Sequence, residues 1–127
     1  MRSNRSRDTA PELAVRSAVH GMGLRFRVNA RPLRDLRRTA DIVFPRQRVA
    51  IFIDGCFWHG CPIHYSAPSA HSEYWATKVA TNRARDRQTD QLLREAGWTV
   101  LRVWEHDPSD VVAQQIAGTV RRLRARE

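Results

Sequence analysis

A continuous apolar run near the middle of the chain most limits the folds that this sequence can adopt. Residues 49–53 read Val-Ala-Ile-Phe-Ile, with the charged residues Arg48 and Asp54 at the two ends of the run. A short run rich in β-branched and aromatic side chains is typical of a strand that is covered on both faces. We therefore expect residues 48–54 to form the central strand of a sheet that has helices on both sides.

Capping residues mark the expected ends of the helices. Thr9 and Glu12 have the spacing of a capping box, in which each side chain bonds the other residue's backbone amide. Gly21 and Gly23 would end this first helix. The later signals are Ser72 as N-cap of a long helix that runs to residue 96 before Gly97, and Asp107 with Pro108 as N-cap and first residue of the last helix.

Shorter segments complete the predicted fold. Alternating or apolar stretches predict further strands at residues 25–28, 40–44 and 98–104, with a turn at 45–47. The order αβββαβα predicts an antiparallel meander, a helical crossover and a parallel strand. The expected fold class is therefore α/β in the broad sense, an α+β domain with a mixed central sheet and flanking helices. One domain should cover residues 1–127, with residues 1–7 as a short basic N-terminal arm.

The positive charge is concentrated in the first part of the chain. The formal net charge is +9, and Lys78 is the one lysine among 22 basic residues. Residues 1–50 contain 12 basic and 4 acidic residues, whereas the remainder contains 10 and 9. A GC-rich genome would explain the preference for arginine equally well, but it would not explain this polarity. The distribution indicates a polyanionic partner such as DNA.

No stretch of the sequence predicts export or a membrane anchor. The longest apolar runs are far shorter than the roughly 18 residues of a membrane span. The basic start of the chain is not followed by an apolar segment of the signal-peptide kind. We therefore expect a cytoplasmic, nucleoid-associated protein.

Two cysteines and a histidine lie close together after the central strand. Cys56, Cys61 and His64 have the spacing Cys-x4-Cys-x2-His, and His106 follows the predicted fourth strand. A closed Cys₂His₂ set is typical of a structural zinc, which would order the loop. His71 is a weaker candidate for the fourth ligand. The alternative is two buried cysteines and two surface histidines.

An aspartate within an apolar strand indicates a cation site. Asp41 precedes Ile-Val-Phe in the predicted strand at 40–44, where an unpaired buried carboxylate would be costly. The turn at 45–47 would bring Asp41 close to residues 51–54, whose carbonyl oxygens could share the ion. Few carboxylates with several waters suit Mg²⁺. The further acidic candidates are Asp54, Asp86 and Glu12.

His59 is a candidate general base. It lies in the same loop as the cysteines but is not needed as a zinc ligand, and a neutral imidazole near a metal can accept a proton. A lone histidine is more often structural, so this interpretation depends on a carboxylate partner such as Asp41.

Aromatic and polar side chains provide candidate contacts to DNA. Phe57 and Trp58 lie between the predicted zinc ligands, and exposed aromatic side chains on a basic protein can stack on bases or wedge between them. The long helix carries polar and aromatic residues at steps of three and four, namely Trp75, Lys78, Asn82, Arg85 and Thr89. Ordinary core packing and a solvated helix face are the alternatives.

Several of these segments together resemble the very short patch repair (Vsr) endonuclease family. They occur in the family's order and cover residues 7–106. The segments are Arg7-Asp-Thr-Ala-Pro-Glu12, Ala40-Asp-Ile-Val-Phe44, Phe52-Ile-Asp-Gly-Cys-Phe-Trp-His-Gly-Cys-Pro-Ile-His64, Glu73-Tyr-Trp75, Asn82, Arg85-Asp-Arg87 and Gly97-Trp-Thr-Val-Leu-Arg-Val-Trp-Glu-His106. The resemblance implies a restriction-endonuclease-like αβββαβ core, an order that the predicted elements share.

The resemblance also implies an activity and a set of roles. The activity is a strand-specific nick 5′ of the thymine in a T·G mismatch, the lesion left by deamination of 5-methylcytosine. The implied roles are Mg²⁺ binding by Asp41 and the Ile53 main-chain carbonyl, general base for His59, support by Asp86 and Glu12, a DNA wedge of Phe57, Trp58 and Trp75, and zinc binding by Cys56, Cys61, His64 and His106.

Two departures from the family pattern affect the site. Arg38-Thr-Ala40 stands where the family has Gly-Arg-Pro before the metal-binding aspartate. The sequence also has no lysine near the third strand of the kind typical of the wider nuclease superfamily, which gives His59 more weight.

Two other functions fit parts of the same pattern. One is a restriction-type or structure-specific nuclease of the same fold with a different target. The other is a non-catalytic zinc module that binds DNA, for which the basic half and the Cys/His cluster would suffice. A monomer suffices for nicking one strand, and a mismatch-repair protein is a candidate partner.

Overall fold

The computed structural model describes residues 9–55 and 71–126. The predicted basic arm at 1–7 and the loop residues from Cys56 to residue 70 lie outside this description. The elements in chain order are α1 (Ala10–Gly21), β1 (Arg27–Ala30), β2 (Ala40–Phe44), β3 (Val49–Asp54), α3 (Ser72–Glu95), β4 (Thr99–Trp104) and α4 (Ser109–Arg124).

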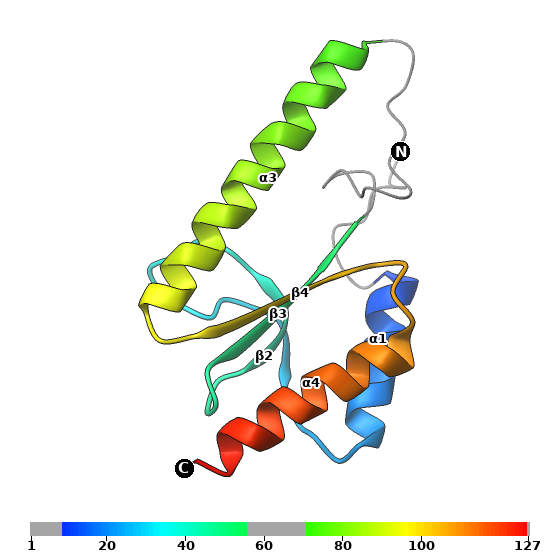
Figure 1. Ribbon diagram of the computed structural model, residues 1–127, viewed down its shortest axis with the longest axis vertical. Coiled ribbons are helices and arrows are strands. Elements are labelled where there is room, and N and C mark those ends of the chain that lie inside the picture. Colours follow the sequence, from blue (N-terminus) through cyan, green and yellow to red (C-terminus); the bar gives the residue numbers. More distant parts are fainter. Residues whose placement is uncertain (1–8, 56–70, 127) are drawn as a thin grey trace.

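The four strands form one mixed sheet in the order β1-β2-β3-β4. The pairs β1–β2 and β2–β3 are antiparallel, and β3–β4 is parallel. The helices α1 and α4 cover one face of this sheet, and α3 covers the other (Figure 1). The predicted element order, mixed sheet and flanking helices are therefore confirmed.

The central strand β3 is buried along its whole length, as its apolar run predicts. Ile51 and Ile53 belong to a core with α1 and α4. Ala50 and Phe52 belong to a second core, which includes Leu93 of α3. This alternation follows from the two-residue period of a strand, and it leaves Asp54 on the α3 side at the strand's end.

The strands β2 and β3 separate where β3 continues alongside β4. Their register runs from Phe44 opposite Val49 to Ile42 opposite Ile51. The register of β3 with β4 continues to Asp54 opposite Trp104. The end of β3 therefore has a strand partner on the β4 side but none in register with β2, and its backbone groups on that side must find other partners.

The first strand starts two residues later than the sequence predicts. β1 covers Arg27–Ala30 rather than residues 25–28. The Arg25 guanidinium donates hydrogen bonds to the carbonyl oxygens of His20 and Leu24, and Leu24 is fully buried. These contacts hold the chain against the end of α1 before it can join the sheet.

Two predicted N-caps are also wrong by one residue. The N-cap of α3 is His71, with φ of 59°, and Ser72 is already the first helical residue. The N-cap of α4 is Pro108 rather than Asp107. The Asp107 carboxylate instead accepts a hydrogen bond of 2.8 Å from the backbone amide of Trp104, which holds it at the end of β4.

The helix α3 extends well beyond the sheet. Its C-terminal half packs on β4 and the neighbouring strands, while its N-terminal half projects away from the body of the domain (Figure 1). In that projecting half, Val79 is a buried side chain among mostly exposed residues. No helix in the described ranges is long and apolar enough to cross a membrane.

Two glycine substitutions should change stability in opposite directions. Gly97 ends α3 with φ of 90°, and a Cβ there would lie 3.4 Å from the Arg48 guanidinium. Gly97→Ala should therefore lower the free energy of unfolding by roughly 1–2 kcal/mol. Gly118 lies inside α4 with open space around it, so Gly118→Ala should raise it by roughly 0.5–1 kcal/mol. Urea unfolding measures both, and changes of the same sign would contradict the assigned backbone conformations.

Candidate active site

Asp41 occupies the point where β2 and β3 separate. Its Oδ2 accepts a hydrogen bond of 2.6 Å from the backbone amide of Ile53. The carboxylate thus satisfies an amide that lies beyond the register of the two strands. Among residues 9–55 and 71–126, no second hydrogen bond reaches this carboxylate. Oδ1 therefore has no hydrogen-bond partner in the described part of the chain and could serve as a ligand atom.

The surroundings of Asp41 disfavour its charged form. Burial raises the pKa of Asp41 from 3.8 to about 7, and the nearby charges of Glu12 and Asp54 add to the rise. The Ile53 amide and, more weakly, Arg16 oppose it. A carboxylate that is costly to ionise in a hydrogen-bonded, fixed position favours a bound cation, which would stabilise the charged form.

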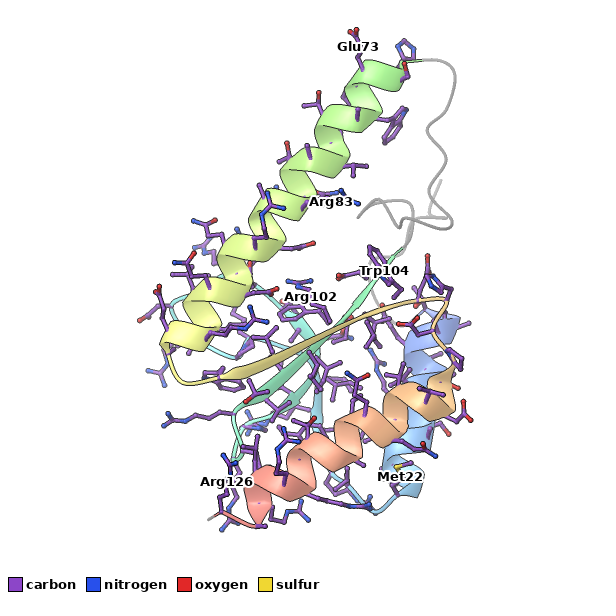
Figure 2. All side chains as sticks on the ribbon, viewed as in Figure 1. Met22, Glu73, Arg83, Arg102, Trp104 and Arg126 are labelled. Carbon is purple, nitrogen blue, oxygen red and sulfur yellow. The ribbon has the colours of Figure 1, made fainter. Side chains whose placement is uncertain are left out.

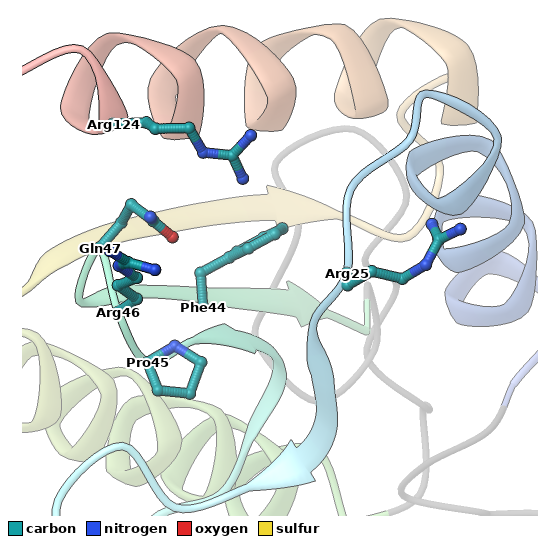
Figure 3. Close-up of a pocket in the computed structure, with 6 residues that line it drawn as sticks. All are labelled: Arg25, Phe44, Pro45, Arg46, Gln47 and Arg124. Atoms are coloured by element: carbon teal, nitrogen blue, oxygen red, sulfur yellow. The ribbon is translucent and has the colours of Figure 1, made fainter.

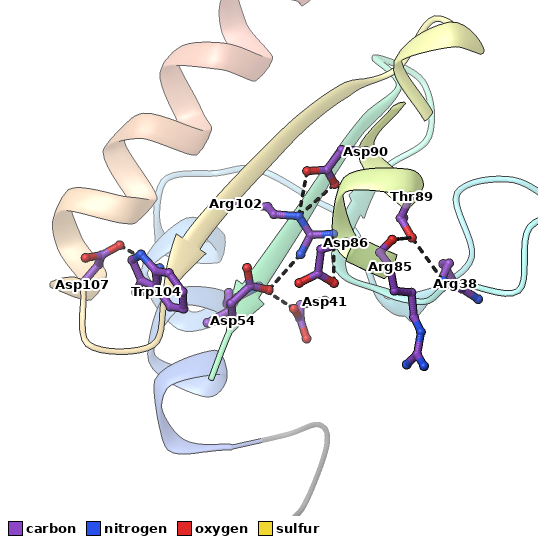
Figure 4. Close-up of polar contacts among 11 residues, drawn as sticks. Arg38, Asp41, Asp54, Arg85, Asp86, Thr89, Asp90, Arg102, Trp104 and Asp107 are labelled. Carbon is purple, nitrogen blue, oxygen red and sulfur yellow. Dashed lines mark hydrogen bonds and ion pairs between the residues drawn. The ribbon is translucent and has the colours of Figure 1, made fainter. Parts of the chain in front are cut away.

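A pocket of about 190 Å³ opens beside Asp41 on the α3 side of the sheet. The described residues that line it are Arg38, Thr39, Asp41, Phe52, Ile53, Asp54, Asp86, Thr89 and Arg102. They come from β2, β3, β4, α3 and the segment before β2. Figure 4 shows Asp41, Asp54, Asp86 and Arg102 near one another. Sequence positions 38 to 102 thus meet at one end of the sheet.

The predicted acidic residues reach this pocket to different extents. Asp86 lines it from α3, as does Asp54 from the end of β3. Glu12 is buried in α1 close enough to affect Asp41, but it does not line the pocket. Its carboxylate pairs with Arg16 at 3.5 Å. Glu12 can therefore influence the site through its charge.

Arg102 is a pocket residue that the sequence patterns did not predict. Its guanidinium lies in the pocket, where it pairs with Asp54 at 2.9 Å, Asp90 at 2.8 Å and Asp86 at 3.6 Å (Figure 4). The criterion that identified Asp41 could have identified Arg102, because both are charged residues within otherwise apolar strands. The third strand lacks the lysine that is typical of the wider nuclease superfamily, but the pocket contains a basic side chain from a strand, Arg102 of β4.

The geometry around Asp41 fits a cation that keeps much of its water. Within the described residues, no group of three or more His, Cys, Asp or Glu side chains is arranged to hold a metal ion. Asp41 Oδ1 would need main-chain oxygen and water as additional ligands. Mg²⁺ meets this condition, since it commonly binds through one or two carboxylates and several waters.

The candidate DNA-contacting residues of α3 run from its projecting half, with Trp75, Lys78 and Asn82, to Arg85 just past the middle of the helix. Lys78 and Arg85 are exposed, whereas Trp75 and Asn82 are partly buried. The Trp75 ring meets the exposed Tyr74 edge to face, with 5.1 Å between the ring centroids. Figure 2 shows side chains along this half of the helix, from Glu73 to Arg83.

Thr89 does not continue that surface. It is buried, donates to the Arg85 carbonyl and accepts a hydrogen bond from Arg38 Nε at 3.2 Å. The polar surface predicted for the helix therefore ends before residue 89, where α3 meets the sheet.

The predicted zinc ligands are only partly described. His106 lies just after β4, stacked on Trp104 with 6.4 Å between ring centroids, and its Nε2 is 3.5 Å from Asp107. His71 is exposed at the start of α3. The remaining predicted loop residues lie outside the description, namely Cys56, Phe57, Trp58, His59, Cys61 and His64. The zinc set, the general base and the wedge, including Trp75, therefore stay predictions.

A second pocket lies at the opposite end of β2 from Asp41 (Figure 3). It measures about 340 Å³ and lies between the β2–β3 turn and the end of α4. Its described lining includes Arg25, Arg46 and Arg124 and no carboxylate. A divalent cation would therefore favour the smaller, acidic pocket.

Comparisons with known proteins agree on one family. The family model described as DNA mismatch endonuclease Vsr matches residues 1–64. Type II nicking enzyme V.NaeI of Lentzea aerocolonigenes is 42% identical over 97% of this chain and 75% of its own length. V.XorIIP of Xanthomonas oryzae pv. oryzae is 44% identical over 89% and 82%. DNA mismatch endonuclease Vsr of Escherichia coli K12 is 40% identical over 83% and 66%.

The raised pKa of Asp41 predicts a particular dependence of stability on pH. The folded protein keeps this proton up to about pH 7, whereas the unfolded chain loses it near 3.8. The stability of the cation-free protein should therefore fall as the pH rises from about 4 to 7. Asp41→Asn should remove this loss and stabilise the EDTA-treated protein at pH 8 by roughly 2–4 kcal/mol, with the gain shrinking towards pH 4.

Melting curves across this pH range test the prediction, with the exposed Asp35→Asn as control. Millimolar Mg²⁺ should stabilise the wild type at pH 8 and leave Asp41→Asn unchanged. An Asp41→Asn protein that followed the wild type at every pH would contradict the raised pKa.

Proposed function

The chain belongs to the Vsr family of DNA mismatch endonucleases, and we propose that it is a Mg²⁺-dependent endonuclease that nicks one strand of DNA. The observation that carries this proposal is the Asp41 carboxylate, which the Ile53 amide holds at the mouth of an acidic pocket with one oxygen available. Its family, its basic first half and its cation-favouring carboxylate support the same activity.

The residues of the pocket can divide the work of phosphodiester hydrolysis. Asp41 Oδ1 and the main-chain carbonyl of Ile53 would hold Mg²⁺. When bound, the ion would offset charge on the phosphate and make a water molecule easier to deprotonate. His59 is the proposed general base, and Asp86 and Glu12 are the proposed supporting acids. Arg38, which lines the pocket, adds positive charge near the entering phosphate.

The finer proposal concerns the target. The relative from Escherichia coli is named a mismatch endonuclease, which favours nicking 5′ of the thymine in a T·G mismatch. Phe57, Trp58 and Trp75 would form the wedge at the mismatch. Lys78, Asn82 and Arg85 would contact the DNA alongside them, because they follow Trp75 along α3 at steps of three and four residues.

A second target is supported by a different observation. Several relatives are named type II nicking enzymes, which favours a restriction-type nickase with its own target sequence. The Asp41 pocket serves either target. A non-catalytic zinc module is less well supported, because binding DNA would not require a partly buried carboxylate fixed beside a pocket.

Zinc would have a structural part in this enzyme. The proposed ligands are Cys56, Cys61, His64 and His106, which would hold the aromatic loop next to the end of β4. The proposed surroundings are the cytoplasm and its DNA, and a mismatch-repair protein is a proposed partner.

Labelled oligonucleotide duplexes test the activity and the target. With Mg²⁺, we expect a single nick 5′ of the thymine in the T·G duplex, little cleavage of the matched T·A duplex, and none in EDTA. Asp41→Ala should lower the nicking rate by at least about a thousandfold, since metal-ion catalysis contributes several kcal/mol. Asp35→Ala should nick like the wild type. Equal cleavage of both duplexes would favour the restriction-type target over the mismatch. DNA binding without any cleavage would overturn the proposal that the protein is an endonuclease.

The same duplexes test the role of Trp75. A side chain that wedges between bases pays an unstacking cost that is lower at a mismatch, so Trp75→Ala should reduce the preference for T·G by about tenfold. Tyr74→Ala is the matched control, because Tyr74 is the more exposed neighbour on the same helix. Equal losses on T·G and T·A, with a lowered melting temperature, would show that Trp75 only packs.

Metal analysis tests the zinc proposal. Protein purified without added metal should contain one zinc per chain, and Cys56→Ala or Cys61→Ala should lose it and melt at lower temperature. His106→Ala should behave like the cysteine variants, whereas His71→Ala should keep the zinc. Zinc-free protein with an unchanged melting curve would contradict the proposal.

A further inference from the structure

Arg102 is held in the candidate active site from several sides. It lies on β4 opposite Phe52 of β3, and its guanidinium carbon is 4.2 Å from the centroid of the Phe52 ring. Its Nε donates to both oxygens of Asp90, at 2.8 and 2.9 Å, and its Nη1 donates to Asp54 at 2.9 Å. The side chain is only 19% exposed. Its position is therefore fixed by β3 and α3 together.

The partners of Arg102 are carboxylates that a metal ion could otherwise bind. Asp54 and Asp86 line the same pocket as Asp41, and their side chains are 11% and 21% exposed. Asp90 stands one helical turn after Asp86. A guanidinium that meets several carboxylates at these distances offsets charges that would otherwise attract a second divalent cation.

Asp41 differs from these carboxylates in its partners. Within the described residues, its one hydrogen bond comes from a neutral amide, and no ion pair joins it to Arg102. Arg38 also lines the pocket, but it bonds the Thr89 hydroxyl and the Arg37 carbonyl rather than a carboxylate. Both arginines therefore add positive charge to the pocket, but of the two only Arg102 forms ion pairs with carboxylates.

We propose that Arg102 is a positioning residue that keeps Asp54 and Asp86 from binding a divalent cation, so that the pocket holds a single ion at Asp41. The guanidinium takes the place that a second ion would have in a cluster of this charge. This inference rests on the proposed function, because it assumes that the Asp41 pocket is the metal site of the nuclease.

Mn²⁺ titration of the protein as purified, without DNA, tests this proposal. Calorimetry or electron paramagnetic resonance at pH 8 should find one Mn²⁺ per wild-type chain in this pocket. Arg102→Gln should bind a second Mn²⁺, or bind the first about tenfold more tightly, because no guanidinium then offsets the charges of Asp54, Asp86 and Asp90. Arg102→Lys, which keeps the charge, should bind one.

Arg38→Gln is the matched control, since it removes the same charge from the same pocket without freeing a carboxylate. It should change the Mn²⁺ affinity by no more than about threefold. If Arg102→Gln and Arg38→Gln bind alike, the effect is one of net charge and the proposal is overturned. Unchanged binding by a folded Arg102→Gln protein overturns it as well.

Asp54→Asn provides a test that does not depend on the folding of Arg102→Gln. Because Asp54 is withheld from the cation, this variant should bind one Mn²⁺ within about threefold of the wild-type affinity. A tenfold or greater loss would make Asp54 a ligand and overturn the proposal. Nicking is measured separately: if the predicted binding pattern appears in a protein that cuts no duplex, the inference stands and the proposed function fails.

Discussion

The burial of β3 on both faces is the constraint on which the rest of this structure depends. A strand with no solvent-exposed face can place polar functional side chains only at its end. In β3 that residue is Asp54, which lies beyond the antiparallel register with β2. The parallel strand β4 continues past that point and brings Arg102 beside Phe52. The site is thus located where one neighbouring strand leaves β3 and the other remains.

The protein has a strongly positive net charge but a pocket that is lined by three aspartates. The net charge of +9 attracts DNA over the distance that salt allows, about 8–10 Å. Within the pocket, Asp41, Asp54 and Asp86 face Arg38 and Arg102, and the local balance favours a cation. The two preferences do not conflict, because the first acts between whole surfaces and the second between atoms a few ångströms apart.

The parts of the fold that were predictable from sequence are those that local patterns determine. The apolar runs predicted β2 as observed and β3 to within one residue. Asp41 was identified because an unpaired carboxylate buried in an apolar strand would be costly. The start of β1 and the N-cap of α4 were predicted wrongly because a side chain there bonds a different local partner. Arg25 donates to the His20 carbonyl at the end of α1, and Asp107 accepts from the Trp104 amide.

The interactions of Arg102 were beyond such patterns. Its partner Asp54 lies 48 positions away in sequence, and the pair forms only because α3 crosses over the sheet and returns the chain in parallel beside β3. Periodicity identifies which face a residue occupies, but it does not identify which charges meet on that face.

The helix α3 also sets a length. Its 24 residues extend roughly 36 Å at 1.5 Å per residue, and a helix of this kind behaves as a stiff rod. Trp75 and Asp86 are eleven residues apart, or about 16 Å along the axis. The helix therefore acts as a spacer that fixes how far Trp75, the proposed wedge residue, stands from the pocket that Asp86 lines. One residue inserted between them would turn the tryptophan by about 100° and move it by about 1.5 Å, so the length of α3 would be as closely constrained as its side chains.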